Sequence, residues 1–145
     1  MDKNHPKQLN LLLVEDSPAD VYLVQEAIRQ EGLDVQMQVI QDGEQALALL
    51  DRIEEAGAPC PSAFLLDLNL PRKTGQEILG KMRSGERCGK IPVLVITSSD
   101  APGDRKRAMD LGAADYFVKP SRLDEFMSLG KIVRSVCEKA SGVAA

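Results

Sequence analysis

Cysteines, aromatic residues and long apolar segments are all scarce in this 145-residue sequence. The cysteines are odd in number and far apart, at Cys60, Cys88 and Cys137, so we expect neither a disulfide framework nor a zinc-ligand pair. A reducing cytoplasm is the natural setting for such cysteine usage. Apolar runs are only strand-sized, and residues 1–8 lack the apolar core of a signal peptide. We therefore predict a cytoplasmic protein with no membrane partner.

Excess positive charge is also absent, because 18 basic and 22 acidic residues give a net charge of −4. The basic residues occur in short clusters such as Arg105–Arg107, and such clusters are usually solvated helix faces. We therefore predict no nucleic-acid partner. A composition of 43% hydrophobic and 28% charged residues is ordinary for one folded α/β domain.

Short apolar runs alternate with segments of helical spacing. Alternating βα units predict a parallel sheet with helices on both faces, which is a doubly wound α/β fold. We expect residues 1–8 to form a flexible N-terminal segment, 9–140 the single domain and 141–145 a C-terminal tail. The five predicted strands are residues 9–14, 35–40, 63–66, 91–96 and 115–118.

Several predicted helices begin at recognisable signals. Ser17 is the expected N-cap of the first helix, with Pro18 at its first position. The third helix opens with a capping-box pattern formed by Thr74 and Glu77. The last is expected to be one long helix that starts near residue 121.

Polar residues follow four of the five predicted strands: Glu15 and Asp16, Asp67, Thr97 and Lys119. Parallel strands end at the same edge of a sheet, where ligands bind in such folds, so we expect these side chains to lie close together. Strand ends often carry polar residues, and any one of these positions alone would suggest nothing more. Three converging carboxylates would repel one another, so the set indicates a hard cation with oxygen ligands, naturally Mg²⁺.

Asp67 is the best candidate nucleophile, because it follows directly on the apolar run Phe64–Leu66. Glu15 and Asp16 begin a loop that is better suited to wrapping an ion. A metal and Lys119 would offset the spread-out negative charge of phosphoryl transfer, and Thr97 offers a hydroxyl donor. The alternatives are a strand-end cap for Thr97 and a surface ion pair for Lys119.

Four motifs resemble the receiver domain of bacterial response regulators, the phosphoacceptor proteins of two-component systems. They are Leu-Leu-Val-Glu-Asp-Ser-Pro-Ala-Asp at 12–20, Leu-Leu-Asp-Leu-Asn-Leu-Pro-Arg-Lys-Thr-Gly at 65–75, Val-Ile-Thr-Ser-Ser at 95–99 and Tyr-Phe-Val-Lys-Pro at 116–120. The resemblance covers nearly the whole chain. It implies a flavodoxin-like receiver fold with strand order 2-1-3-4-5 and transfer of a phosphoryl group from a histidine kinase.

The resemblance also implies a role for each residue of the site. Asp67 would be the phosphoacceptor, and Mg²⁺, for which Mn²⁺ can substitute, would bind the side chains of Glu15, Asp16 and Asp67 and the backbone carbonyl of Asn69. It further implies that Thr97 and Lys119 bind the phosphoryl group, that Thr97 and Tyr116 form the switch, and that Lys119–Pro120 is a cis peptide. The alternative for Tyr116 is an aromatic strand residue that is half packed on its neighbours.

Residues 57–62, 68–75 and 84–92 resemble single-domain regulators that partner phytochrome-type histidine kinases. A phytochrome is therefore the implied sensor. Such regulators are often homodimers through helix four, strand five and helix five. The sequence leaves open whether that face forms a homodimer or binds a downstream phosphotransfer or regulator protein. Only residues 141–145 follow the last helix, so we expect the signal to leave by protein contact.

Three rival readings share parts of this pattern. Haloacid-dehalogenase-type phosphatases need a second acid two residues beyond the nucleophile, and Asn69 stands there. We therefore expect no enzyme activity beyond self-catalysed phosphotransfer to Asp67. A flavodoxin-like cofactor binder would need a Gly- and Ser/Thr-rich phosphate loop after the first strand, but Glu15 and Asp16 stand there and would repel a phosphate. A phosphorylation-independent docking module is the remaining alternative, and the intact acidic pocket argues against it.

Overall fold

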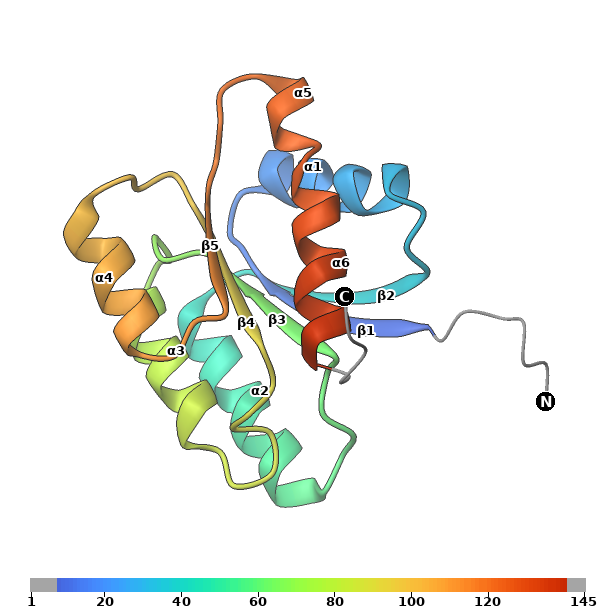
Figure 1. Ribbon diagram of the computed structural model, residues 1–145. Coiled ribbons are helices and arrows are strands. Elements are labelled where there is room, and N and C mark those ends of the chain that lie inside the picture. The colour runs from blue at the N-terminus through green and yellow to red at the C-terminus, as the bar shows by residue number, and fades with distance from the viewer. Residues whose placement is uncertain (1–7, 141–145) are drawn as a thin grey trace, which may run out of the picture.

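The structure is a computed structural model that describes residues 8–140 (Figure 1). The expected C-terminal tail and almost all of the expected N-terminal segment therefore lie outside the described residues. Within 8–140, no helix is both long enough and apolar enough to cross a bilayer.

Five parallel strands form one sheet in the order β2-β1-β3-β4-β5. The predicted doubly wound α/β fold and its strand order are therefore confirmed. The fourth strand starts two residues later than expected, after Pro92, which has no N–H for the sheet. The strands are β1 (Leu9–Val14), β2 (Val35–Ile40), β3 (Ala63–Leu66), β4 (Val93–Thr97) and β5 (Asp115–Val118).

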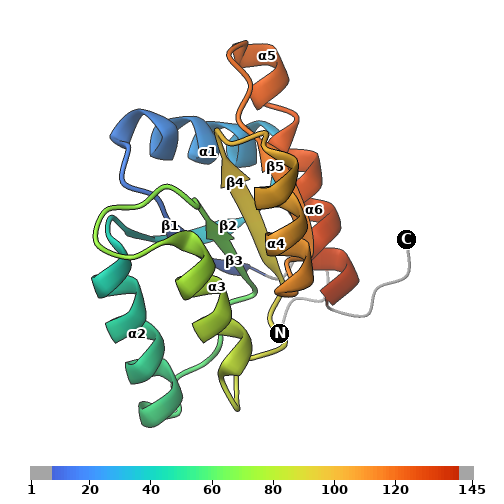
Figure 2. The same ribbon diagram turned by 90° about the vertical axis from the view of Figure 1, so that its left-hand side faces the viewer.

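Two helical layers cover the sheet (Figures 1 and 2). One face packs against α2 (Gly43–Ala56), α3 (Gly75–Ser84) and α4 (Pro102–Asp110). The other face packs against α1 (Pro18–Gln30), α5 (Leu123–Phe126) and α6 (Leu129–Ala140). Successive strand residues point to opposite faces, so in β1 Leu12 contributes to the first core and Leu13 to the second. The central strands β3 and β4 are buried along their whole length, which holds their ends rigidly.

The predicted N-caps of the first and third helices are present, but the last helix differs from its prediction. The Ser17 hydroxyl accepts a hydrogen bond from the Asp20 N–H, and the Thr74 hydroxyl accepts one from the Glu77 N–H. The predicted single long helix is instead split into α5 and α6. At the junction of the two helices the N–H groups of Ser128, Gly130 and Lys131 bond to carbonyls three residues back, which tightens the chain and interrupts the α-helix.

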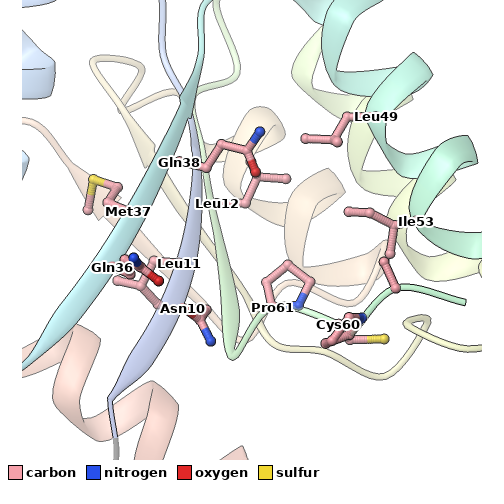
Figure 3. Close-up of a pocket in the computed structure, with 12 residues that line it drawn as sticks. Asn10, Leu11, Leu12, Gln36, Met37, Gln38, Leu49, Ile53, Cys60 and Pro61 are labelled. Atoms are coloured by element: carbon pink, nitrogen blue, oxygen red, sulfur yellow. The ribbon is translucent and has the colours of Figure 1, made fainter. Parts of the chain in front are cut away.

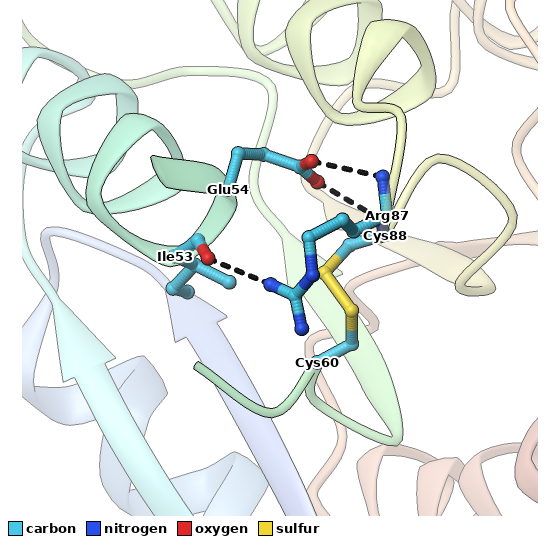
Figure 4. The surroundings of a disulfide bond; sticks show 5 residues. All are labelled: Ile53, Glu54, Cys60, Arg87 and Cys88. Carbon is cyan, nitrogen blue, oxygen red and sulfur yellow. Dashed lines mark hydrogen bonds between the residues drawn. A yellow bond between two sulfur atoms is a disulfide. The ribbon is translucent and has the colours of Figure 1, made fainter. Parts of the chain in front are cut away.

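The prediction that no cysteines would pair is wrong, because Cys60 and Cys88 form a disulfide with their Cα atoms 5.6 Å apart (Figure 4). They are 28 residues apart in the sequence, but they precede β3 and β4, which are neighbours in the sheet. The Glu54 carboxylate accepts hydrogen bonds of 2.8 Å from the N–H groups of Arg87 and Cys88. These contacts fix the segment before β4. Cys137 is free and buried.

A pocket of about 660 Å³ opens at the amino end of the sheet, beside the edge strand β2 (Figure 3). Gln36 and Gln38 line it from β2, while Leu49 and Ile53 line it from α2. Cys60 and its two flanking prolines complete the wall. The pocket lies away from the carboxyl ends of the strands, where sequence analysis places the site.

Candidate functional site

The structure brings the five predicted residues to the carboxyl edge of the sheet. Glu15 and Asp16 follow β1, Asp67 follows β3, Thr97 ends β4 and Lys119 follows β5. Two backbone hydrogen bonds extend the strand pairing into this region: Asp67 N–H donates to the Val14 carbonyl at 3.0 Å and Lys119 N–H to the Thr97 carbonyl at 2.7 Å. The side chains therefore leave from neighbouring, fixed points.

The ammonium group of Lys119 lies at the centre of the site. Its Nζ atom is 2.6 Å from Glu15 Oε1, 2.8 Å from Asp20 Oδ2 and 3.1 Å from Asp67 Oδ2. The Lys119 side chain is 10% exposed, so these ion pairs are largely shielded from water. The alternative of a simple surface ion pair for Lys119 does not describe this arrangement.

Glu15, Asp16 and Asp67 form the acidic cluster, in which one carboxylate oxygen from each residue lies within 4.8 Å of the others. Glu15 and Asp67 are buried, while Asp16 is exposed at the mouth of the cluster. Oxygen ligands from several carboxylates, with one side open to water, suit Mg²⁺ or Mn²⁺. The three predicted carboxylate ligands are thus close enough to share one ion.

Burial raises the pKa of Glu15 to about 7, although the hydrogen bond from Lys119 acts in the opposite direction and the nearby Asp67 charge adds to the rise. Burial alone would lower the pKa of Lys119, but its hydrogen bonds to Asp20 and Glu15 and the charge of Asp67 outweigh it and raise that pKa. The site thus holds more negative charge than one lysine can balance.

Asp67 is held by the chain that follows it. The Asn69 N–H donates to Asp67 Oδ1 at 3.0 Å, which leaves Oδ2 to Lys119. Gly75 closes this loop, because its N–H bonds to the Leu68 carbonyl and a Cβ there would lie 2.4 Å from the Leu68 Cα. Only glycine allows this close approach.

Thr97 and Tyr116 have definite partners in this structure. The Thr97 hydroxyl oxygen accepts a hydrogen bond from the Asn69 side chain at 3.4 Å and one from the Ser99 N–H at 3.3 Å. Tyr116 is buried, and its hydroxyl donates to the Ser99 carbonyl at 2.9 Å. Arg105 covers the ring, with its guanidinium carbon 5.4 Å from the ring centroid. Tyr116 therefore points inward, and both candidate switch residues contact Ser99.

The predicted cis peptide at Lys119–Pro120 is wrong, because residues 8–140 contain no cis peptide bond. Trans is the favoured state of an X–Pro bond by about 0.5–1 kcal/mol unless the surroundings select cis. Here Lys119 reaches all three carboxylates with the trans bond in place.

Asp20 is a member of the site that was not predicted from the sequence. It lies in the first turn of α1, and its carboxylate contacts Lys119. A signal was present, since Asp20 is the last residue of the 12–20 motif and an acid in the first helical turn after Asp16. The α1 N-terminus brings it back over the carboxyl edge of the sheet.

The sequence profile of the response regulator receiver domain matches residues 11–130. Response regulator Rcp1 of Synechocystis sp. (strain ATCC 27184 / PCC 6803 / Kazusa) is 34% identical over 135 residues, which span 92% of this chain and 91% of Rcp1. The probable methanogenesis regulatory protein FilR2 of Methanothrix harundinacea (strain 6Ac) is 35% identical over 79% of this chain and 74% of its own.

Solved structures agree with these relatives. The Mn²⁺-bound form of Rcp1 superposes with a TM-score of 0.77 and 34% identity, over 88% of this chain and 92% of Rcp1. The phosphorylated cyanobacterial phytochrome response regulator RcpA superposes with a TM-score of 0.79 and 33% identity, over 96% of this chain and 98% of RcpA. The resemblance to receivers, and to phytochrome-linked regulators among them, is confirmed. The chain therefore belongs to the response regulator receiver domain family.

Proposed function

We propose that the protein is a single-domain response regulator that accepts a phosphoryl group from a histidine kinase on Asp67. The observation that carries this proposal is the contact set of the Asp67 carboxylate: it lies in the acidic cluster with Glu15 and Asp16, and Lys119 donates to its Oδ2. A rigid carboxylate beside a cation suits a nucleophile for phosphoryl transfer. We infer no enzyme activity beyond this reaction on the protein itself.

In the transfer step, a carboxylate oxygen of Asp67 forms a bond to the phosphorus of a phosphohistidine. The P–N bond breaks, and its electron pair stays with the leaving imidazole. Lys119 offsets charge on the phosphoryl oxygens, and the Thr97 hydroxyl turns to donate to one of them. The product is an acyl phosphate on Asp67.

The ligands for a divalent ion would be the side chains of Glu15, Asp16 and Asp67 and the backbone carbonyl of Asn69. The fit is supported by the carboxylate oxygen donors, which lie within 4.8 Å of one another, and by the three carboxylates that share the single ammonium of Lys119. Mg²⁺ is the proposed ion, with Mn²⁺ as a substitute, since the related Rcp1 has been solved with Mn²⁺. Such an ion supplies positive charge to the phosphoryl oxygens.

Signal output is proposed to follow from the contacts around Ser99. When Thr97 turns toward a phosphoryl group, it gives up its bond to the Ser99 N–H, and Tyr116, which donates to the Ser99 carbonyl, can change its rotamer. This would alter the face formed by α4, β5, α5 and α6. That face would mediate homodimerisation or bind a downstream phosphotransfer or regulator protein.

The proposed partner is a sensor histidine kinase of the phytochrome type in the cytoplasm. The similarity to RcpA, which is named as a phytochrome response regulator, supports this choice over other kinases. The partner can be tested with purified kinase: a phytochrome kinase should phosphorylate this chain faster than an unrelated histidine kinase does. Equal rates would remove the phytochrome assignment.

The test of the acceptor is intact mass spectrometry after incubation with acetyl phosphate and Mg²⁺. Wild type should gain one phosphoryl mass, and Asp67→Asn or chelation of the metal should abolish the gain. Asp100→Asn is a matched control, because Asp100 lies beyond β4 and outside the acidic cluster. If folded, metal-binding wild type never gains this mass, a phosphorylation-independent docking role replaces the proposal.

A further inference from the structure

Lys119 has three ammonium hydrogens and three carboxylate partners, and these partners are not equivalent. Glu15 and Asp67 belong to the acidic cluster, so they are the oxygens that a divalent ion would engage. Asp20 contacts Lys119 at 2.8 Å and is not part of that cluster. It is therefore the one partner in this set that stays available when the cluster is occupied.

Asp20 is held in place by the start of α1. Its N–H donates to the Ser17 hydroxyl at 3.3 Å, and the Ser17 N–H donates to Glu15 Oε2 at 3.2 Å. The Asp20 side chain is 28% exposed, against 1% for Glu15. This position gives it a fixed backbone at the rim of the site and a carboxylate directed at Lys119.

We propose that Asp20 is a positioning residue, which keeps the Lys119 ammonium at the phosphoryl site when Glu15 and Asp67 are engaged by a divalent ion. The proposal rests on the proposed function, because it assigns Lys119 to the phosphoryl group.

The physical reason is charge balance in a shielded site. A divalent ion in the acidic cluster repels the ammonium of Lys119, and it takes over two of the three carboxylates that held that ammonium. The Lys119 side chain is 90% buried by the surrounding protein, so water screens this repulsion poorly. Asp20 is the remaining counter-charge in this set. Without it, the long lysine side chain would swing toward solvent and leave the acceptor.

A simpler account would treat Asp20 as an ordinary acid in the first turn of a helix, where the helix dipole favours negative charge. That account predicts the same effect of Asp20→Asn whether or not Lys119 is present. Positioning predicts that the effect disappears without Lys119. The two accounts are separated by a double-mutant cycle.

The cycle comprises wild type, Asp20→Asn, Lys119→Met and the double variant, all with saturating Mg²⁺. The initial rate of phosphorylation by acetyl phosphate should fall roughly tenfold with Asp20→Asn when Lys119 is present, as expected for loss of one charge-assisted hydrogen bond. It should change less than about twofold in the Lys119→Met background. An equal fall in both backgrounds, or no fall in either, overturns the proposal.

Two further variants separate positioning from a general effect of charge. Asp20→Glu retains the carboxylate and should recover most of the rate that Asp20→Asn loses. Glu44→Gln removes a first-turn acid from α2 that pairs with Arg72 and not with Lys119, and it should leave the rate unchanged. If Asp20→Glu is as slow as Asp20→Asn, or if Glu44→Gln is equally slow, Asp20 does not position Lys119.

A readout independent of phosphorylation uses the same four proteins in urea unfolding at saturating Mg²⁺. The effect of Asp20→Asn on the unfolding equilibrium constant should be roughly tenfold larger when Lys119 is present than in the Lys119→Met background. Coupling that vanishes when Mg²⁺ is added would overturn the proposal, because Asp20 would then have released Lys119. This measurement decides the question even if wild type takes up no phosphoryl group, an outcome that would refute only the proposed function.

Discussion

The two ends of the sheet are stabilised by different kinds of interaction. At the carboxyl end, one ammonium is shared among three carboxylates, all at least partly buried. At the amino end, the segments before β3 and β4 are joined by the Cys60–Cys88 disulfide and by backbone hydrogen bonds to Glu54 (Figure 4). Ion pairs can exchange partners when a ligand arrives, whereas a covalent link cannot. The molecule is therefore adaptable at one end and fixed at the other.

The same two strands connect these ends. β3 runs from the Cys60 side to Asp67, and β4 runs from the Cys88 side to Thr97. Both strands are completely buried. Because this burial holds the strands in place, the backbone of the acceptor and of the proposed phosphoryl-binding residue should stay fixed whether or not the amino ends are linked. Weakening each end separately should therefore have separable effects.

The largest effect is expected from Lys119→Met in metal-free protein. Removing the cation leaves Glu15 and Asp67 buried without a counter-charge, so the free energy of unfolding should fall by about 3–5 kcal/mol. Mg²⁺ should restore more stability to this variant than it adds to wild type, because it replaces the lost positive charge. Urea unfolding with and without Mg²⁺ measures both effects.

Lys81→Met is the matched control for that experiment. Lys81 pairs with Asp51 at 2.7 Å, but both side chains are about half exposed. Such surface pairs contribute about 0–1 kcal/mol. If Lys119→Met lowers the free energy of unfolding no more than Lys81→Met does, the carboxyl end does not depend on its shared cation.

Reduction of the disulfide should have the next largest effect. For a closed loop of 28 residues, the chain-entropy relation gives a loss of about 3–4 kcal/mol. Non-reduced, denatured protein should accept one alkyl group, on Cys137, and reduced protein three. Phosphorylation of Asp67 by acetyl phosphate should change little at a temperature where the reduced protein stays folded. A large loss of phosphorylation in folded, reduced protein would show that the two ends are not independent.

The disulfide also marks a limit of sequence analysis. The fold and the convergence of Glu15, Asp67, Thr97 and Lys119 were predictable, because apolar periodicity and the parallel order of βα units determine which residues follow the strands. The pairing of Cys60 with Cys88 depends on how two loops approach each other at the opposite edge. Sequence separation alone carries no information about that distance.

The contact of Asp20 with Lys119 and the break in the last helix were also not predictable from the sequence. Asp20 belongs to a helix, and only the angle at which α1 leaves β1 brings its carboxylate to Lys119. α6 starts at a close contact with α1, where a Cβ on Gly130 would lie 2.5 Å from the Ala27 carbonyl oxygen. Such close approaches between elements have no periodic signature in the sequence.

A smaller, pH-dependent effect is expected from Glu15 in metal-free protein. Its pKa is raised to about 7 in the folded state from an ordinary value of 4.5, so the folded state binds this proton more tightly than the unfolded state does. The resulting stability is complete below pH 4.5 and is lost as the pH rises through 7. With solvent screening on the open side, we expect a loss of about 2 kcal/mol.

Glu15→Gln provides the reference for this titration, because it cannot ionise and keeps the shape of the side chain. The difference in unfolding free energy between wild type and Glu15→Gln, measured in chelator from pH 4 to 8, should therefore shift against wild type as the pH rises. A difference that is independent of pH, or that shifts in favour of wild type, would contradict the raised pKa of Glu15.

The smallest effect concerns Tyr116, also near the carboxyl end. Tyr116→Phe removes the hydrogen bond from the hydroxyl to the Ser99 carbonyl at 2.9 Å and keeps the buried ring and its contact with Arg105. We expect a loss of about 1 kcal/mol in unfolding free energy, while the acetyl phosphate reaction at Asp67 continues. Tyr22→Phe, at a side chain that is 63% exposed, should change neither quantity. If Tyr116→Phe instead stopped phosphorylation of folded protein, Tyr116 would act in the transfer step itself. The residues of the carboxyl end that take part in this step would then include an uncharged residue of β5.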